Sequence, residues 1–465
     1  MRVRLAGVAV VAVLAAGCGG GGGSSASDAD SLVPGNALAF ATIDTDTSSG
    51  QVASALKILK KFPIEPRAEQ QLRASITRSG VDFNALTSSA GSEIDIAVIK
   101  VNEQPQTVGL AKPSNEKAFD AQLDKSSAKH TTMKGWTVFA DKQATLDAFT
   151  KQSGSSIADD PAYQAAIKTI PADGDAVARF YASSAGAQTA LGAATSGIGQ
   201  SAGSLKSFAA TNWVAGSLAS EDGAFKLEVH AKSKSAKTIP SGNALADKIP
   251  AGSIVALALQ GGGTTVPASA QEQLSVLGQQ IGVDLPALVS ALNGPVIAYV
   301  RPGIPLPEVT IAARPAQPRP AAAAIGALLA RFANGAQAVP TKVDGGTLSK
   351  LDLGPIALYF GVNDGQLVVT DSSNALAELK GSVGRLSGDA VFKEAKDGAG
   401  MSDSAQGFMY LDIKDALPAL SGFAQLANQN LPPEVETNLR PLRSALLFGS
   451  TVGGLQTFVA YVKTS

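Results

Sequence analysis

Cysteine and histidine are almost missing from this chain. It has one cysteine, Cys18, and two histidines among 465 residues. A single thiol cannot form an internal disulfide. A zinc site built from four Cys and His ligands is excluded as well. We therefore expect no cofactor and no transition-metal centre, while a calcium site made of carboxylates alone stays open.

An excess of charge is also missing. The chain has 38 basic and 39 acidic side chains, a formal net charge of −1, and only 5% aromatic residues. Nucleic-acid binding usually needs a basic face, and attraction to anionic lipid headgroups needs a polybasic segment. Neither feature is present in the sequence, so we expect no nucleic-acid partner.

A membrane-spanning run is missing too, but the N-terminus carries a different membrane signal. Arg2 and Arg4 precede a short apolar run, residues 5–17, which falls below the roughly 20 residues that span a bilayer. This arrangement is typical of a secretory signal peptide. The run ends in Ala15-Ala16-Gly17-Cys18, which resembles the bacterial lipobox, although Leu is more common at the position of Ala15.

That resemblance implies a diacylglycerol thioether on Cys18, with cleavage just before it. More than one acyl chain supports stable anchoring, because each buried methylene contributes roughly 0.8 kcal/mol. The alternative is a freely secreted protein with a chance cysteine. The anchor is favoured because the only cysteine of the chain falls at this position.

The remaining chain suggests two domains on a tether. We predict a signal peptide over residues 1–17 and the lipidated Cys18 with a flexible Gly/Ser tether over 18–31. Two domains follow, over 32–235 and 249–465, with a linker at 236–248. The protein is then extracytoplasmic, held on the outer face of the cell membrane by its lipid.

The two predicted domains share sequence patterns in the same order. Gly80–Leu86 matches Gly282–Leu288, and Gly135–Asp141 aligns without a gap to Gly365–Asp371. In the second pair the final Asp is expected to cap a helix that starts directly after it. We interpret the domains as tandem homologous repeats.

Strand-like runs joined by short turns dominate both repeats. Asp222-Gly223 and Gly453-Gly454 are favourable hairpin turns, and further strands are predicted at Ala176–Tyr181 and Gly407–Leu411. Helices are inserted between the strands instead of alternating strictly with them. The predicted fold is α+β, with a mostly antiparallel sheet in each repeat.

Several of these residues resemble a family of actinobacterial envelope proteins, the domain of unknown function 3352 family. The similarity lies in Leu32–Phe40 running into Asp44–Asp46, in Leu56–Pro63, and in Gly365–Asp371. It implies a secreted or lipid-anchored protein and supplies no activity.

One segment matches the nucleophile-elbow pattern of serine hydrolases. It is Gly199–Gly203, with Ser201 at its centre, and Asp222 and His230 follow in the right order. That elbow requires a buried strand before the serine, whereas residues 187–198 are mostly small and not strand-like. The acid and the histidine also follow on one hairpin, so a hydrolase is the most distant alternative.

Other motifs have simpler explanations. Ser54–Lys57 and Ser126–Lys129 have the Ser-x-x-Lys spacing of penicillin-binding enzymes but lack the companion motifs. Asp44 and Asp46 would point to the same side of a strand and could share a cation. The corresponding residues 260–265 contain no acid, so a polar strand end is favoured.

Two stretches of small residues give the last signal. Residues 185–203 and 321–332 could leave an apolar groove where they cross a sheet, or they could simply pack closely on it. Packing is favoured. The sequence therefore predicts a non-enzymatic, lipid-anchored binding or scaffolding module with an envelope protein as partner. The alternative is a carrier or sensor of an apolar or lipid ligand.

Overall fold

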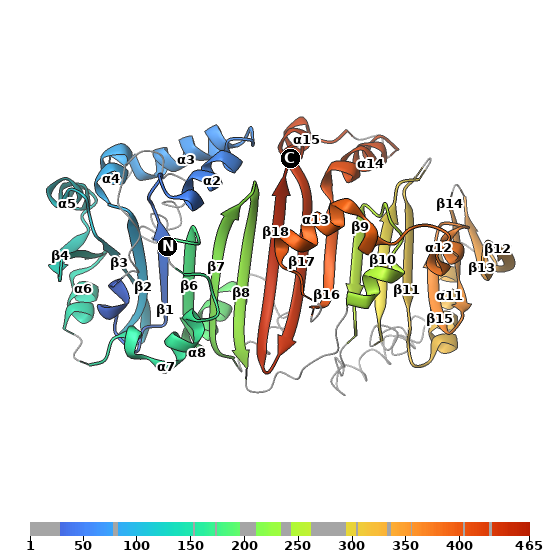
Figure 1. Ribbon diagram of the computed structural model, residues 1–465, viewed down its shortest axis with the longest axis horizontal. Helices are drawn as coiled ribbons and strands as arrows, with labels where there is room; N and C mark the ends of the chain where they lie inside the picture. The colour runs from blue at the N-terminus through green and yellow to red at the C-terminus, as the bar shows by residue number, and fades with distance from the viewer. Residues whose placement is uncertain are drawn as a thin grey trace. The chain divides into compact units, whose positions relative to one another are not determined.

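The computed structural model of the chain mixes helix and antiparallel sheet (Figure 1). It describes residues 28–77, 82–151, 154–172, 174–195, 211–233, 243–261, 294–303, 306–332, 336–354, 356–402, 405–426 and 430–465. About 33% of the chain is helical and 39% is strand, which confirms the α+β class. The chain divides into two compact units, one of residues 1–237, 453–459 and 464–465, the other of residues 238–452 and 460–463.

The first unit contains an antiparallel sheet with the strand order β4-β5-β3-β2-β1-β6-β7-β8. Its strands are β1 (Ala39–Asp44), β2 (Glu93–Val101), β3 (Gln104–Ala111), β4 (Lys129–Met133), β5 (Trp136–Ala140), β6 (Ala178–Ser183), β7 (Thr211–Glu221) and β8 (Ala224–Ser233). Because side chains alternate between the two faces of each strand, this sheet has two separately covered faces.

Helices cover both faces of the first sheet. The main core includes Trp136, Tyr181 and Trp213, under residues of α6, η2 and α7. A smaller core on the other face joins Phe139 to α4 and α5. The helices are η1 (Ala29–Ser31), α2 (Gly50–Leu59), α3 (Glu65–Thr77), α4 (Phe83–Ser89), α5 (Glu116–Lys125), α6 (Gln143–Thr150), η2 (Ile157–Asp159), α7 (Pro161–Ile167) and α8 (Ser184–Thr195).

The second unit also contains an antiparallel sheet, with the strand order β12-β13-β14-β15-β11-β10-β9-β16-β17. Its strands are β9 (Val255–Leu259), β10 (Val296–Arg301), β11 (Glu308–Ala313), β12 (Val339–Val343), β13 (Gly346–Leu353), β14 (Ile356–Asn363), β15 (Gln366–Thr370), β16 (Ala405–Asp412) and β17 (Leu442–Val452). The final strand, β18 (Leu455–Thr464), has residues in both units.

Helices of the second unit again pack on the sheet. Phe392 of α13 meets Tyr410 edge to face, and α11 packs on β14 and β15 through Ile325 and Leu329. The helices are η4 (Asn243–Lys248), α11 (Pro318–Phe332), α12 (Ala375–Lys380), η5 (Leu386–Gly388), α13 (Ala390–Ala399), α14 (Ile413–Leu426) and α15 (Pro433–Leu439). Residues 243–248 fall in the predicted linker but form η4, because Ala246 and Ile249 are buried.

The two sheets pair their strands in the same register. In the first unit Phe40 pairs with Ala97 and Tyr181, and in the second Ala256 pairs with Tyr299 and Tyr410. Tyr181 and Tyr410 each contact one aromatic ring from a helix, that of Tyr163 on α7 and that of Phe392 on α13. The ring centroids are 5.2 Å apart and the interplanar angle is 89° in both units. The second unit differs by two additional strands between α11 and β15.

The predicted hairpin turns are confirmed in the backbone. Asp222 and Gly223 have φ values of 48° and 76°, and Gly453 and Gly454 have 56° and 78°. Two consecutive left-handed residues are the requirement of a type I′ turn. These dipeptides therefore sit where the chain reverses after β7 and after β17.

The predicted helix caps at Asp141 and Asp371 are wrong. The N-cap residues of α6 and α12 are Lys142 and Asn374, and neither side chain accepts a capping hydrogen bond. Asp371 lies at the end of β15 next to β11, and its Oδ1 accepts the Val309 N–H at 2.7 Å. The Asp371 carboxylate therefore binds the neighbouring strand β11 at the end of the sheet and does not cap α12.

Part of the predicted tether is folded. Residues 29–31 form η1 with Asp28 as its N-cap, and Ala29 is fully buried. The Trp136 Nε1–H donates to Asp28 Oδ1 at 3.0 Å. The predicted signal peptide, Cys18 and residues 19–27 lie outside the described residues. Over the residues that are described, no helix combines the length and apolarity needed to cross a membrane.

Candidate functional site

The structure does not assemble the predicted serine-hydrolase set over the residues it describes. Ser201 and its elbow, residues 199–203, lie outside them. Asp222 is in the turn of the β7–β8 hairpin, whereas His230 pairs with Ala215 several ladder positions away. The acid and the imidazole are therefore not brought together.

His230 has different partners, which the sequence analysis missed. Its Nε2 lies 2.9 Å from Glu228 Oε1, and its Nδ1 lies 3.1 Å from Thr457 Oγ1. Glu228 could have been found from its spacing, because residues i and i+2 share one face of a strand. Thr457 could not, because it is 227 residues away in sequence. Both imidazole nitrogens are engaged, which favours a structural role.

The other sequence motifs are local structure. Ser54 and Lys57 lie on α2. The Asp46 N–H donates to Asp44 Oδ1 at 2.8 Å, and Ser48 donates to Asp46. This is a strand end entering a turn, as the sequence analysis favoured. Within the described residues no group of three or more His, Cys, Asp or Glu could hold a metal ion.

The small residues of α8 permit a close approach to the sheet. A Cβ atom at Gly186 would lie 1.8 Å from the Leu38 carbonyl oxygen. Only glycine fits at this position, so the described part of the 185–203 stretch packs directly on a neighbouring strand. For this helix the packing interpretation holds.

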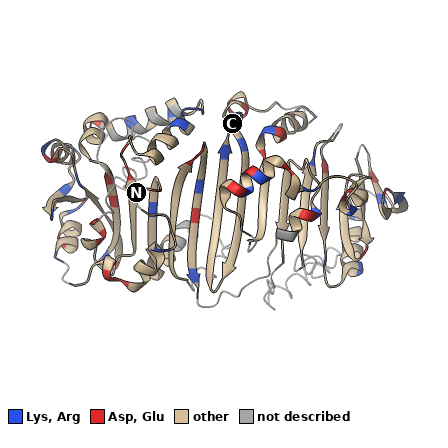
Figure 2. Cartoon of the chain, in the orientation of Figure 1, with Lys and Arg blue, Asp and Glu red and all other residues tan. Residues whose placement is uncertain are grey.

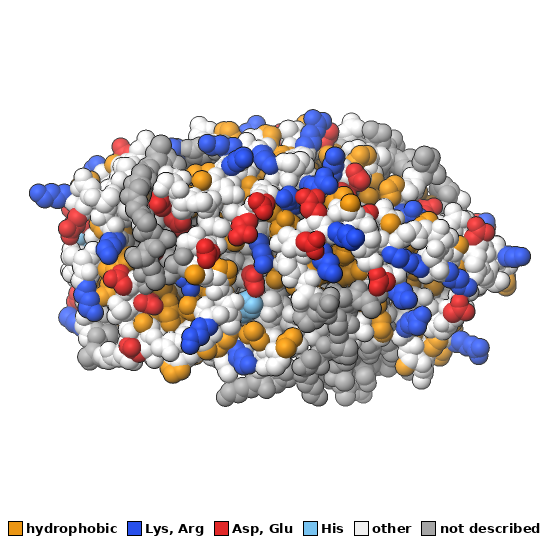
Figure 3. Space-filling model, viewed as in Figure 1, with side chains coloured by type: hydrophobic (Ala, Val, Ile, Leu, Met, Phe, Trp, Pro, Cys, Tyr) orange, Lys and Arg blue, Asp and Glu red, His pale blue; other side chains and the backbone are white. Residues whose placement is uncertain are grey.

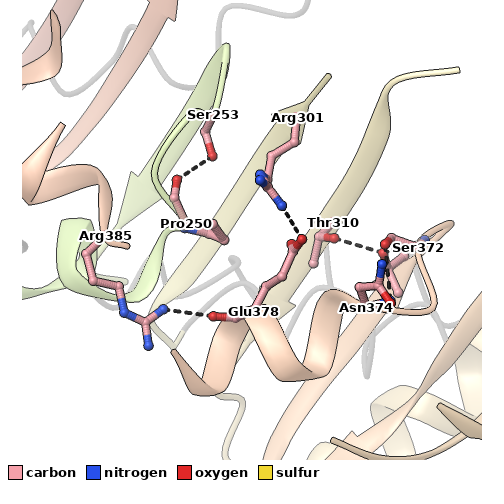
Figure 4. Close-up of polar contacts among 9 residues, drawn as sticks. Pro250, Ser253, Arg301, Thr310, Ser372, Asn374, Glu378 and Arg385 are labelled. Carbon is pink, nitrogen blue, oxygen red and sulfur yellow. Dashed lines mark hydrogen bonds and ion pairs between the residues drawn. The ribbon is translucent and has the colours of Figure 1, made fainter. Parts of the chain in front are cut away.

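A buried polar region of the second unit, the Arg301 cluster, consists of Tyr299, Arg301, Thr310, Thr370 and Glu378. Figure 4 shows Arg301, Thr310 and Glu378 of this cluster. Arg301 Nη1 donates to Glu378 Oε1, and the side chain of Glu378 is only 7% exposed. The strands β10, β11 and β15 supply the other members side by side, because Tyr299 pairs with Thr310 and Thr310 with Thr370. The cluster therefore lies across three neighbouring strands beneath α12.

Hydrogen bonds extend the Arg301 cluster to both ends of α12. The Thr310 and Thr370 hydroxyls are 2.8 Å apart, and Thr370 Oγ1 also accepts the Ser372 N–H at 3.0 Å. At the other end, Arg385 donates to the carbonyl oxygens of Glu378 and Leu379 at 2.9 and 3.2 Å. The last carbonyls of a helix lack the i+4 donors of its interior, and the Glu378 carbonyl also accepts the Gly381 N–H at 3.0 Å. The guanidinium thus caps α12.

Part of the Arg301 cluster has no protein partner. The Tyr299 hydroxyl and Arg301 Nε are both buried without a hydrogen bond. Burial raises the pKa of Tyr299, and burial also raises the pKa of Glu378 against the opposing effect of Arg301. Buried polar groups without hydrogen bonds destabilise a protein and are rare in native structures. These groups of the cluster therefore lower the stability of the folded state.

The first unit has its own buried polar region, the Asp95 cluster of Thr42, Glu93, Asp95, Arg179 and Asp30. Thr42 on β1 pairs with Asp95 on one side and Arg179 on the other. Asp95 is fully buried, and neither of its carboxylate oxygens has a hydrogen bond of normal geometry. Burial, and then the charge of Glu93, raise the pKa of Asp95 well above its usual range.

The two clusters occupy different positions of the shared register. The first-unit positions equivalent to Tyr299, Arg301, Thr310 and Thr370 are Ala97, Ile99, Val108 and Ala140, all fully buried. The second-unit positions equivalent to Thr42, Asp95 and Arg179 are Ala258, Ile297 and Phe408, which are buried as well. The same sheet therefore forms with apolar residues at either place, and neither cluster is required by the fold.

The opposite face of the second sheet exposes large apolar side chains. Leu259, Ile311 and Met409 are 46%, 44% and 44% exposed, on β9, β11 and β16. Ile311 and Met409 belong to one row, because each pairs through Ala298 and Leu257 across the intervening strands. Exposed apolar side chains gathered on one face indicate an interaction surface more often than scattered ones do.

Charges are mixed over the described surface. Figure 2 shows acidic and basic residues on helices and strands of each unit, and Figure 3 shows both signs interspersed over the face in view. A field of one sign, which would steer a nucleic acid or a polyanion, needs like charges gathered together. That view gives no support to such a partner.

Comparison with known proteins gives no assignment. No family model matches the chain, and no curated protein and no solved structure is significantly similar to it. Function must therefore be argued from the residues themselves.

Proposed function

We propose that this protein is a non-enzymatic envelope lipoprotein, anchored through a lipid on Cys18 to the outer face of the cell membrane. The observation that carries the proposal is the only cysteine of the chain, placed directly after a signal-like segment and ten residues before Asp28, whose side chain accepts from Trp136 in the first unit. Residues 19–27 can span at most roughly 30 Å. The folded chain would thus stay close to the bilayer.

The body is proposed to be a duplicated binding or scaffolding module for an envelope protein partner. The identical strand register of the two units supports duplication, as do the bridges of Pro34 with Ser156 and of Pro250 with Arg385. Asp160 and Asp389 also cap the equivalent helices α7 and α13.

The chemistry of the described residues favours binding over catalysis. A hydrolytic centre needs a nucleophile, a base and an orienting acid within hydrogen-bond reach of one another. Here Asp222 and His230 lie apart, and the His230 imidazole is held between Glu228 and Thr457. Failure of a fluorophosphonate probe to label Ser201 is the expected result for the full chain.

The anchor is tested by replacing Cys18 with Ser in the native host. We expect the wild-type protein to fractionate with membranes and to incorporate a labelled fatty acid. The Cys18→Ser protein should lose the label and move to the soluble extracytoplasmic fraction. If Cys18→Ser stays with the membrane as the wild type does, the anchor proposal is wrong.

A carrier of lipid acyl chains is the second candidate, favoured by the exposed face of Leu259, Ile311 and Met409. An anchored protein would meet membrane lipid as its most abundant apolar ligand. Native mass spectrometry of the Cys18→Ser protein should then show bound lipid, and an added Ile311→Ser/Met409→Ser pair should remove it. Ile64→Ser is the matched control, because Ile64 is 54% exposed in the first unit. Absence of lipid from the Cys18→Ser protein would reject the carrier.

A further inference from the structure

The Asp95 cluster contains more acid than its surroundings can neutralise. Asp30, Glu93 and Asp95 share it with one cation, Arg179. Asp95 has no hydrogen-bond donor at either oxygen, and Glu93 Oε1 is buried without a partner as well. An ionised carboxylate in such a place is strongly disfavoured unless it is paired.

Polar and charged groups face Asp95 from several elements, while β3 places the apolar Leu110 beside it. Glu93 lies on the same face of β2, and Thr42 lies opposite on β1, with Arg179 beyond it on β6. Asp30 of η1 and Tyr163 of α7 come from the layer above the sheet. Asp44, opposite Glu93 on β1, and Asp28, next to Asp30, complete the set, and both are acids.

A proton held between two carboxyl groups solves this problem. The protonated carboxyl gains an O–H donor, and the neighbouring carboxylate can accept it, so one negative charge is removed and one hydrogen bond is gained. A second negative charge close to an existing carboxylate is disfavoured for the same reason. The second unit has Ile297 at the position of Asp95 and Pro295 at the position of Glu93, so it provides no such pair.

We propose that Asp95 keeps its proton in the folded first unit and donates it to a Glu93 oxygen, and that loss of this proton at rising pH loosens η1 and α7 from the sheet. The device would make the first unit sensitive to the pH outside the cell through a carboxyl pair that the second unit lacks.

The sign follows from linkage. A carboxyl group whose pKa is raised by folding binds its proton more tightly in the folded state. Its contribution to stability is complete below the unfolded pKa of about 3.9 and is lost as the pH rises toward the raised folded pKa. The first unit should therefore lose stability between acid and neutral pH, over a range in which paired carboxylates usually gain it.

The test uses the Cys18→Ser protein and its two tryptophans. Trp136 and Trp213 both lie in the core of the first unit, so the fluorescence transition in urea reports that unit. We expect the midpoint to fall as the pH rises from 4 to 8, and Asp95→Asn to raise the midpoint at pH 8 and flatten its pH dependence. Asp412→Asn, which changes a buried acid of the second unit, should leave the fluorescence midpoint unchanged.

Infrared spectroscopy gives a readout that does not depend on a stable variant. The protein at neutral pH should show the carbonyl band of a protonated carboxylic acid, and its loss on titration should coincide with faster hydrogen exchange in residues 29–31 and 161–167. Where Asp95→Asn folds, it should remove that band, and Asp412→Asn should not. A wild-type protein without the band, or an Asp95→Asn protein with the wild-type pH profile, would overturn the proposal.

Discussion

Replacing only one partner of the Arg301–Glu378 ion pair should destabilise the second unit, whereas replacing both partners by apolar residues should not. Glu378→Leu removes the carboxylate that accepts from Arg301 and leaves a buried guanidinium, whose Nε already has no partner. Breaking a buried pair in this way typically costs 3–5 kcal/mol. Glu308 remains opposite Arg301 in the ladder and reduces the penalty, so we expect about 3 kcal/mol for this unit.

The double replacement Arg301→Ile/Glu378→Leu should restore most of that loss. The first unit has Ile99 at the position of Arg301, fully buried in an apolar core, and apolar substitutes for buried ion pairs are often neutral or stabilising. We expect the double variant to lie within about 1 kcal/mol of the wild type. The coupling energy between the two sites would then be about 2 kcal/mol or more.

The assay is urea unfolding, monitored by the hydrogen exchange of β10, β11 and α12. With a urea m-value of about 3 kcal/mol/M for a unit of this size, the single replacement should lower the midpoint by about 1 M. Tryptophan fluorescence reports the first unit and serves as the internal control. A double variant as unstable as Glu378→Leu would refute the reasoning, because the pair would then be required by the fold.

Two further predictions concern helix placement. Gly186→Val should force α8 away from Leu38 and lower the free energy of unfolding by about 1–3 kcal/mol, which would appear as an earlier transition in tryptophan fluorescence. Gly50→Ala is the control, because an added Cβ there meets nothing within 4 Å, and equal midpoints for both variants would contradict the packing account. Asp389→Ala should lower the free energy of unfolding by about 1 kcal/mol, because it removes the carboxylate that accepts from the Val391 and Phe392 N–H groups. Asp389→Asn should retain most of that stability in thermal unfolding. An alanine variant as stable as the wild type would show that the cap contributes nothing.

Local chemistry explains why much of the fold could be predicted. The hairpin turns at Asp222-Gly223 and Gly453-Gly454 need only two left-handed residues in a row, and the Asp160-Pro161 start of α7 needs only a cap and a proline. These signals act within a few residues. They are visible in the sequence for that reason, as are the alternating strands.

The buried clusters could not be predicted, because they depend on register between distant segments. Arg179 lies beside Thr42, and Thr42 beside Asp95, only because β6 and β2 each pair with β1 at one particular offset. The same is true of Glu378, which comes from a helix 77 residues after Arg301. Asp371 shows that a local signal can also mislead. It has the sequence features of a helix cap, but its carboxylate accepts a hydrogen bond from Val309 on the neighbouring strand instead.

Mass spectrometry of the N-terminal peptide tests the central claim most directly. The protein would be purified from membranes of its own host and its N-terminus identified. The account predicts that the chain begins at Cys18 and that this peptide carries the mass of a diacylglycerol, with or without an amide-linked acyl chain. An unmodified Cys18, or a peptide that continues upstream of it, would contradict the account.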